Sequence, residues 1–318
     1  MEAIYQSRSF ESFRDYINRK KAMESEHMSG NGINDYAYDM DLQLRRRLDK
    51  IPGFFKNAKR FVETISAQEM AMLDQSALQV TPDQYGDIYR AAEDCARKLG
   101  IAMPYVYIRD YMLGNSGPDY GMNAYTIGTD DHQQVIMITG ALVRRSTFGE
   151  LKTIIGHECG HIHNRHIVYT VLFNYLEGIA SGSKLPGFLT LGARMALNAW
   201  SRAAEVTADR AGLICSERVE DALTVQAKLL SGGLESENGF SLESIEKQLN
   251  RQNTNLLRFS ELAYDHPFST RRIMAMKLFS ESDLFARWHP DLVKPGQKLI
   301  RHEDVERQCR EIMDIVRM

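Results

Sequence analysis

The sequence has few cysteines, no long uninterrupted apolar run and almost no excess of charge of one sign. Its 318 residues include four cysteines, with 39 Lys and Arg against 42 Asp and Glu and a net charge of -3. This balance gives no electrostatic basis for binding nucleic acid, so we expect no nucleic-acid partner. The scattered cysteines lack paired metal-type spacing and indicate reduced thiols rather than a disulfide framework.

The sequence also lacks the segments that enter or cross a membrane. The N-terminal residues have no apolar core of the kind a secretory signal needs, so we expect a cytoplasmic protein. The two most apolar stretches, 167–180 and 185–200, are shorter than the roughly 20 residues of a spanning helix. They also contain Glu177 and Arg194. We therefore predict no integral membrane segment.

What the sequence does contain is typical of a globular α+β protein. Hydrophobic residues make up 43% and charged residues 25%, which is ordinary globular composition. Residues 82–99 have the apolar spacing of a helix, with Thr81 as N-cap and Gly100 as stop signal. We predict a mostly helical fold with a small antiparallel β-sheet beside the helix that carries the motif described below.

The predicted sheet is formed from three strand-like runs, at 105–112, 121–128 and 134–139. Residues 129–132 between the last two runs are typical of a hairpin turn. After the strands the pattern is helical almost to the end of the chain. We expect a break at 185–187 and a glycine-rich loop around 232–239.

One predicted helix carries the motif H-E-x-x-H, formed by His157, Glu158 and His161. Side chains four residues apart project from one side of a helix, so both imidazoles can bind one ion with Glu158 beside them. Thr147 and Glu150 form a T-x-x-E capping box that supports the start of this helix. Glu158 falls within the apolar stripe, where a carboxylate needs a compensating partner.

A third metal ligand is needed, because catalytic zinc usually has three protein ligands and one open position. The extended motif H-E-x-x-H-x-x-G-x-x-H is excluded by Asn164 and Ile167. The segment AWSRAAEVTADRAGL offers Glu205 and, one turn later, Asp209; the alternative is a solvated acidic pair on a surface helix. Asp209 can accept a hydrogen bond from a ligand imidazole and fix its tautomer. The predicted ligands of one Zn²⁺ per chain are His157, His161 and Glu205.

Residues around these motifs add two expectations. Small residues near Glu205, among them Ala208, Ala211 and Gly212, allow its helix to lie close to the H-E-x-x-H helix. His163 and His166 fall on the opposite side of that helix from the ligand pair. We expect them to be exposed or hydrogen-bonded rather than to bind the same ion.

Four ordered motifs give the chain its resemblance to a known family: MNAYTIG, TGALVRRSTFGELKTIIGHECGHI, SRAAEVTADRAGL and DHPFSTRRI. The sequence resembles the HtpX and CAAX prenyl protease family of zinc metallopeptidases (the gluzincins of peptidase family M48), and in particular its soluble branch. The resemblance implies a zincin-type metallopeptidase domain over 51–281. An N-terminal helical or partly mobile extension over 1–50 and a C-terminal helical extension over 282–318 would flank it.

The resemblance also implies roles beyond the metal ligands. In the family, the histidine of an H-P pair and an arginine six residues later face the active site, and here these are His266 and Arg272. His266 would be catalytic by stabilising the oxyanion, and Arg272 would brace the site by pairing with a carboxylate such as Asp209. Asn123 and Ala124 match the family strand that binds an extended peptide through main-chain hydrogen bonds.

Together these residues predict a zinc-dependent endopeptidase that acts on peptides or unfolded protein segments. Glu158 would be the general base toward a metal-activated water. Two alternatives stay open. One is a latent enzyme in which residues 1–50 cover the site, and the other is a metal-stabilised peptide-binding or chaperone-like module that does not cut. The sequence leaves the oligomeric state open.

Overall fold

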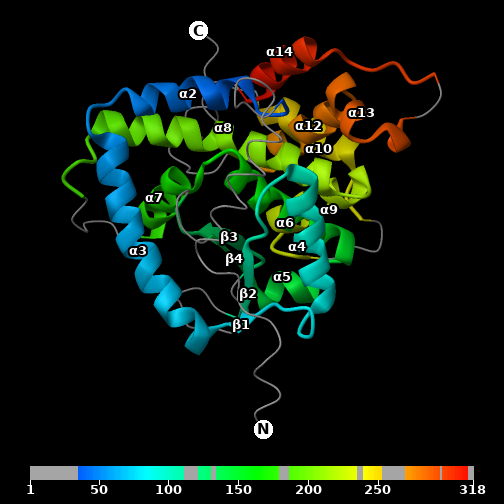
Figure 1. Cartoon of the computed structure of the whole chain (residues 1–318). Coiled ribbons are helices and arrows are strands. Elements are labelled where there is room, and N and C mark those ends of the chain that lie inside the picture. Colours follow the sequence, from blue (N-terminus) through cyan, green and yellow to red (C-terminus); the bar gives the residue numbers. More distant parts are fainter. Residues whose placement is uncertain are drawn as a thin grey trace.

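The structure, a computed structural model, describes residues 35–110, 121–129, 134–178, 186–234, 239–252, 269–293 and 296–313. Its fold is mostly helical with one small sheet, which confirms the predicted α+β class (Figure 1). Within the described residues, the last two strands are preceded by helices α2 (Asp39–Asp49), α3 (Phe54–Ser76) and α4 (Gly86–Leu99). After the sheet come α5 (Gly140–Arg145), α6 (Phe148–His163), α7 (Ile167–Gly178), α8 (Leu191–Cys215), α9 (Val219–Leu230), α10 (Leu242–Gln252), α12 (Ser269–Ser280), α13 (Asp283–Trp288), η2 (Pro290–Leu292) and α14 (His302–Met313).

The sheet is mixed, so the prediction of an antiparallel sheet is wrong in one pairing. Its strands are β1 (Leu78–Gln79), β2 (Tyr105–Arg109), β3 (Ala124–Ile127) and β4 (Val135–Thr139), in the order β1-β2-β4-β3. β3 and β4 pair antiparallel, as the hairpin pattern predicts, although residues 130–133 lie outside the described residues. β2 and β4 pair in parallel. The connection after β2 places β3 beyond β4 in the sheet, and strand composition alone carries no signal for that crossover.

Helix α4 begins four residues later than the sequence predicts. Thr81 and Gln84 form an isolated bridge, and the Gln84 backbone N–H donates to Thr81 Oγ1 at 3.1 Å. Thr81 therefore caps a turn rather than the helix. Tyr85 then adopts a left-handed conformation with φ 56°, and the helix starts at Gly86. The stop signal is confirmed, because Gly100 ends the helix with φ 69°.

Helices α6 and α8 pack against each other at the centre of the fold, where small residues allow a close approach. A Cβ atom added to Gly160 would lie 2.5 Å from the Cβ of Ala211. One added to Gly156 would lie 2.4 Å from the Cβ of Cys215, and one on Gly212 would lie 2.9 Å from a backbone oxygen of α6. None of these positions has room for a side chain, so the small residues of both helices set the distance between the two backbones.

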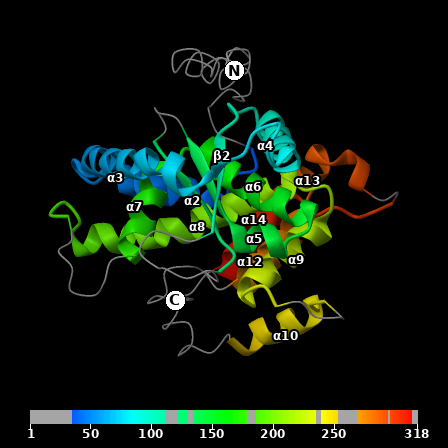
Figure 2. The same ribbon diagram turned by 90° about the horizontal axis from the view of Figure 1, so that it is seen from below.

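Helix α2 lies along α8 (Figure 1). The backbone N–H of Tyr38, just before α2, donates to Thr207 Oγ1 of α8 at 3.1 Å. On the same side, Arg210 of α8 forms a buried ion pair with Glu306 of α14. Seen at 90°, α10 lies at the edge of the structure, where it packs against α12 (Figure 2). The domain boundaries after residues 50 and 281 stay predictions.

The described residues also bear on three smaller expectations. None of their helices combines the length and the apolar character needed to cross a bilayer. All four cysteines are buried, and none is in a disulfide within the described residues. The break expected at 185–187 falls between the end of α7 and the start of α8, and Gly232, Gly233 and Gly239 of the expected glycine-rich loop have positive φ angles. Residue 185 of the break and residues 235–238 of the loop lie outside the described residues.

Candidate metal centre

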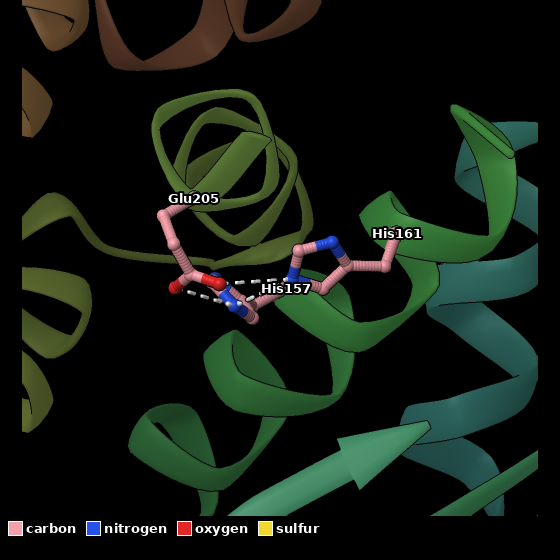
Figure 3. Close-up of side chains that lie close together, drawn as sticks. All are labelled: His157, His161 and Glu205. Carbon is pink, nitrogen blue, oxygen red and sulfur yellow. Dashed lines mark hydrogen bonds and ion pairs between the residues drawn. The ribbon is translucent and has the colours of Figure 1, made fainter. Parts of the chain in front are cut away.

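Helices α6 and α8 bring together the three side chains predicted to bind metal (Figure 3). His157 Nε2 lies 3.2 Å from His161 Nε2 and 3.6 Å from Glu205 Oε2. His161 Nε2 lies 3.5 Å from Glu205 Oε1. Among the residues that the structure describes, this is the one group of three His, Cys, Asp or Glu side chains arranged to hold an ion.

The spacing of these atoms fits a metal ion. A tetrahedral zinc with bonds of about 2.0–2.2 Å keeps its ligand atoms roughly 3.3–3.6 Å apart. His157 Nδ1 lies 3.0 Å from Asp209 Oδ1, and a carboxylate can only accept, so the ring proton sits on Nδ1 and Nε2 presents a lone pair. Lone pairs that face one another at this distance favour a positive charge between them, whether a proton or a metal ion supplies it. Two imidazole nitrogens and one carboxylate suit zinc.

The ligand helices begin with the caps that their sequences encode. The predicted capping box of α6 is complete: Thr147 Oγ1 accepts from the Glu150 backbone N–H, and Glu150 Oε2 accepts from the Thr147 backbone N–H. At the start of α8, Thr190 Oγ1 accepts from the Ala193 backbone N–H at 3.2 Å. Capping of this kind typically contributes about 1 kcal/mol to a helix.

Asp209 is the centre of a buried polar cluster behind the ligands. Its Oδ1 accepts from His157 Nδ1, from Gln226 Nε2 of α9 at 3.0 Å and from Arg272 of α12 at 2.6 Å. Arg272 also lies 2.8 Å from Glu205 Oε2. The predicted pairing of Arg272 with Asp209 is therefore present. Gln226 was not predicted, because a single glutamine in an amphipathic helix gives no signal in the sequence.

The charges of this cluster leave a net attraction for a cation. Burial alone would raise the pKa of Glu205 and Asp209, but Arg272 and the ligand histidines outweigh burial and hold both pKa values below their ordinary range. Burial would lower the pKa of His157, yet Asp209 and Glu205 raise it overall. Two carboxylates thus face one guanidinium, and the remaining negative charge is the one that a bound cation would neutralise.

Glu158 lies beside the ligands and is tied to the sheet. It is 5% exposed, and Thr126 Oγ1 of β3 donates to its Oε2 at 2.7 Å. Thr126 is the compensating partner that a buried carboxylate needs. β3 is an edge strand of the sheet. Asn123 lies just before it, with its backbone N–H bonded to Thr139 Oγ1, and Ala124 is its first residue.

The sequence profile of peptidase family M48 matches residues 82–279. The chain belongs to this family. A chloroplastic plastoglobule-localized metallopeptidase 48 of Arabidopsis thaliana is 27% identical over 63% of the chain and 56% of that protein. A protease HtpX homolog of Streptococcus uberis is 30% identical over 37% of the chain and 36% of that protein. The match to this chain thus spans between about a third and about half of the length of these curated relatives.

Among solved structures, that of S. mikatae Ste24p is similar to the chain with a TM-score of 0.40 and 18% identity, covering 82% of this chain and 66% of that one. The M48 match includes the three candidate ligands, Glu158, Asp209, Asn123, Ala124 and Arg272. It also includes His266, which lies outside the described residues. The functional roles of all these residues stay predictions.

The interpretation of His166 needs a correction. The sequence places it on the far side of the ligand helix, but α6 ends at His163 and Arg165 then turns the chain with φ 56°. His166 therefore packs back against the site, with its Nδ1 3.1 Å from His161 Nδ1. The expectation that His163 and His166 are hydrogen-bonded is confirmed, since His163 Nδ1 lies 2.8 Å from the Tyr36 hydroxyl.

Proposed function

We propose that the chain is a zinc-dependent endopeptidase that hydrolyses peptide bonds in peptides or unfolded protein segments. The observation that carries the proposal is the convergence of His157, His161 and Glu205 with Glu158 held next to them. A site that only stabilises the fold has no use for an added carboxylate and usually fills all four zinc positions with protein ligands. The names of the two curated relatives, a metallopeptidase and a protease, support the same activity.

The mechanism assigns the reaction to the chain's own side chains. Zinc bound by His157, His161 and Glu205 would supply a Lewis acid and a water of lowered pKa, about 7 in enzymes of this type. Glu158 would accept a proton from that water and deliver it to the departing amine. Thr126 supports this role, because its hydrogen bond fixes the orientation of the Glu158 carboxylate.

Two charged side chains would complete the catalytic site. Arg272 holds Glu205 and Asp209 at once, so its guanidinium is committed to bracing the ligands rather than to binding substrate. His266 would donate a hydrogen bond to the oxyanion of the tetrahedral intermediate; this role rests on the family resemblance.

The substrate would lie along the edge strand β3 at Asn123 and Ala124. An exposed strand edge binds an extended peptide through main-chain hydrogen bonds, which discriminate little between peptide sequences. β3 also carries Thr126, which contacts Glu158, so a peptide on this edge would run next to the general base. We therefore propose broad specificity and a requirement for extended segments. A cytoplasmic location stays a prediction.

The test compares the zinc-loaded chain with its Glu158→Gln variant on a library of unstructured peptides. We expect cleavage by the parent and a loss of at least about 100-fold in the variant at equal zinc content. The proposal fails if the zinc-loaded parent cuts no peptide, or if Glu158→Gln cuts as fast as the parent. Recovery of bound peptides whole from the parent would favour the non-cleaving binding module instead.

A further inference from the structure

A buried row of polar side chains leads from His161 to helix α2. His166 Nδ1 lies 3.1 Å from His161 Nδ1, and His166 Nε2 lies 3.0 Å from Asp41 Oδ2. Asp41 also accepts from Trp200 Nε1 at 2.8 Å and from Thr207 Oγ1 at 2.7 Å. His161, His166 and Asp41 are each no more than 3% exposed.

The direction of each hydrogen bond in this row follows from the charge of Asp41, the residue farthest from the metal site. Asp41 holds an ionised carboxylate: burial opposes ionisation, but His166, Thr207 and Trp200 together lower its pKa. An ionised carboxylate only accepts, so the His166 proton lies on Nε2 and its Nδ1 is an acceptor. His161 must then donate from Nδ1. Its Nε2, which faces His157 and Glu205, is left with a lone pair.

We propose that His166 and Asp41 are positioning residues that hold His161 in the metal-binding tautomer and ring orientation. The inference rests on the proposed function only in taking His161 as a metal ligand. A ligand histidine generally donates its second N–H to a carboxylate or carbonyl, and His157 does so directly to Asp209. His161 reaches its carboxylate through one intervening imidazole.

This arrangement makes helix α2 part of the metal centre. Asp41 lies outside the residues that match the family profile, 82–279, and it is held in place by two side chains of α8, the helix that carries Glu205. The position of α2 on α8 therefore sets the position of Asp41 relative to His166. Zinc affinity should depend on a segment that the family motifs do not include.

The test measures zinc affinity by competition with a chromophoric chelator, without any peptide. His166→Phe keeps an aromatic ring but removes both nitrogens, and we expect the affinity to fall about 10- to 100-fold. His166→Gln keeps an acceptor and a donor and should retain most of the affinity. Asp41→Asn leaves a weaker, uncharged acceptor for His166, so we expect it to lower the zinc affinity less than His166→Phe does. The matched control is His163→Phe, on the same helix end but bonded to Tyr36; it should bind zinc like the parent.

Two further readouts separate positioning from a merely structural role. The visible spectrum of the Co²⁺-substituted protein should change in His166→Phe and not in His163→Phe. Only His166 contacts a metal ligand, His161, so only its replacement should alter how that ligand binds the ion. Long-range ¹H–¹⁵N spectra of the parent should show His161 protonated on Nδ1 and His166 on Nε2, a result that holds even if His166→Phe fails to fold. The opposite tautomers, or parental zinc affinity in folded His166→Phe, would overturn the proposal. A chain that meets these expectations but cuts no peptide would refute the endopeptidase and leave the positioning roles intact.

Discussion

Replacing Gly160 by alanine tests whether the close approach of α6 and α8 builds the metal centre. The added Cβ would lie 2.5 Å from the Cβ of Ala211 and 3.2 Å from the Cα of Ala208. Carbon atoms in ordinary contact are about 3.5–4.0 Å apart, so the helices must separate by about 1 Å. Gly160 directly precedes His161, and that movement would carry His161 away from Glu205.

The size of the effect follows from two opposing terms. Overpacking of this kind costs about 1–3 kcal/mol, while replacing glycine by alanine inside a helix returns up to about 1 kcal/mol. We expect a net loss of about 1 kcal/mol in the free energy of unfolding of the zinc-free chain. Zinc affinity should fall as well, because the ligands no longer converge.

A double-mutant cycle with Ala211→Gly separates the packing clash from helix propensity. Ala211→Gly alone should cost about 1 kcal/mol through propensity. Combined with Gly160→Ala, this change removes the methyl group that causes the clash. The double variant should therefore lose less free energy of unfolding than the two single variants lose together, by about 1 kcal/mol or more. Urea unfolding of the zinc-free proteins measures this coupling. Additive effects, or unchanged zinc affinity in Gly160→Ala, would refute the reasoning.

Three further perturbations test other parts of the site and fold. Arg272→Gln leaves two buried carboxylates without their cation, so the free energy of unfolding of the zinc-free chain should fall by about 3 kcal/mol or more. Thermal unfolding should show a smaller loss when zinc is bound. Equal losses with and without zinc would contradict this. Thr126→Val should lower kcat about tenfold at unchanged zinc affinity, because Glu158 loses a hydrogen bond; an unchanged kcat would contradict its role. Burial, followed by the charge of Lys98, lowers the pKa of His289. His289 therefore takes up its proton at a higher pH in the unfolded chain than in the folded chain. The free energy of unfolding should decrease as the pH falls below about 6.5. His289→Gln should flatten this decline in pH-dependent denaturation, and an unchanged slope would argue against it.

The metal centre could be predicted where its geometry is local to one helix. The four-residue spacing of His157 and His161 fixes their common side, and the same spacing places Asp209 one turn from Glu205. The start of α6 was predictable for a similar reason, since its capping box involves residues three apart. In each case the helical repeat converts sequence distance into a direction in space.

The remaining features depend on contacts between distant segments. Helical arithmetic failed for His166 because the helix ends before it and Arg165 reverses the chain. Asp41 and Gln226 reach the site from other helices, and isolated residues of these types give no signal. The parallel pairing of β2 with β4 likewise depends on a crossover rather than on strand composition.

The most direct test of the metal centre is anomalous diffraction at the zinc edge from crystals of the chain grown with zinc. The account predicts one strong peak per chain, within bonding distance of His157 Nε2, His161 Nε2 and a carboxylate oxygen of Glu205. A peak elsewhere, or a zinc ion bound without these three atoms, would contradict it.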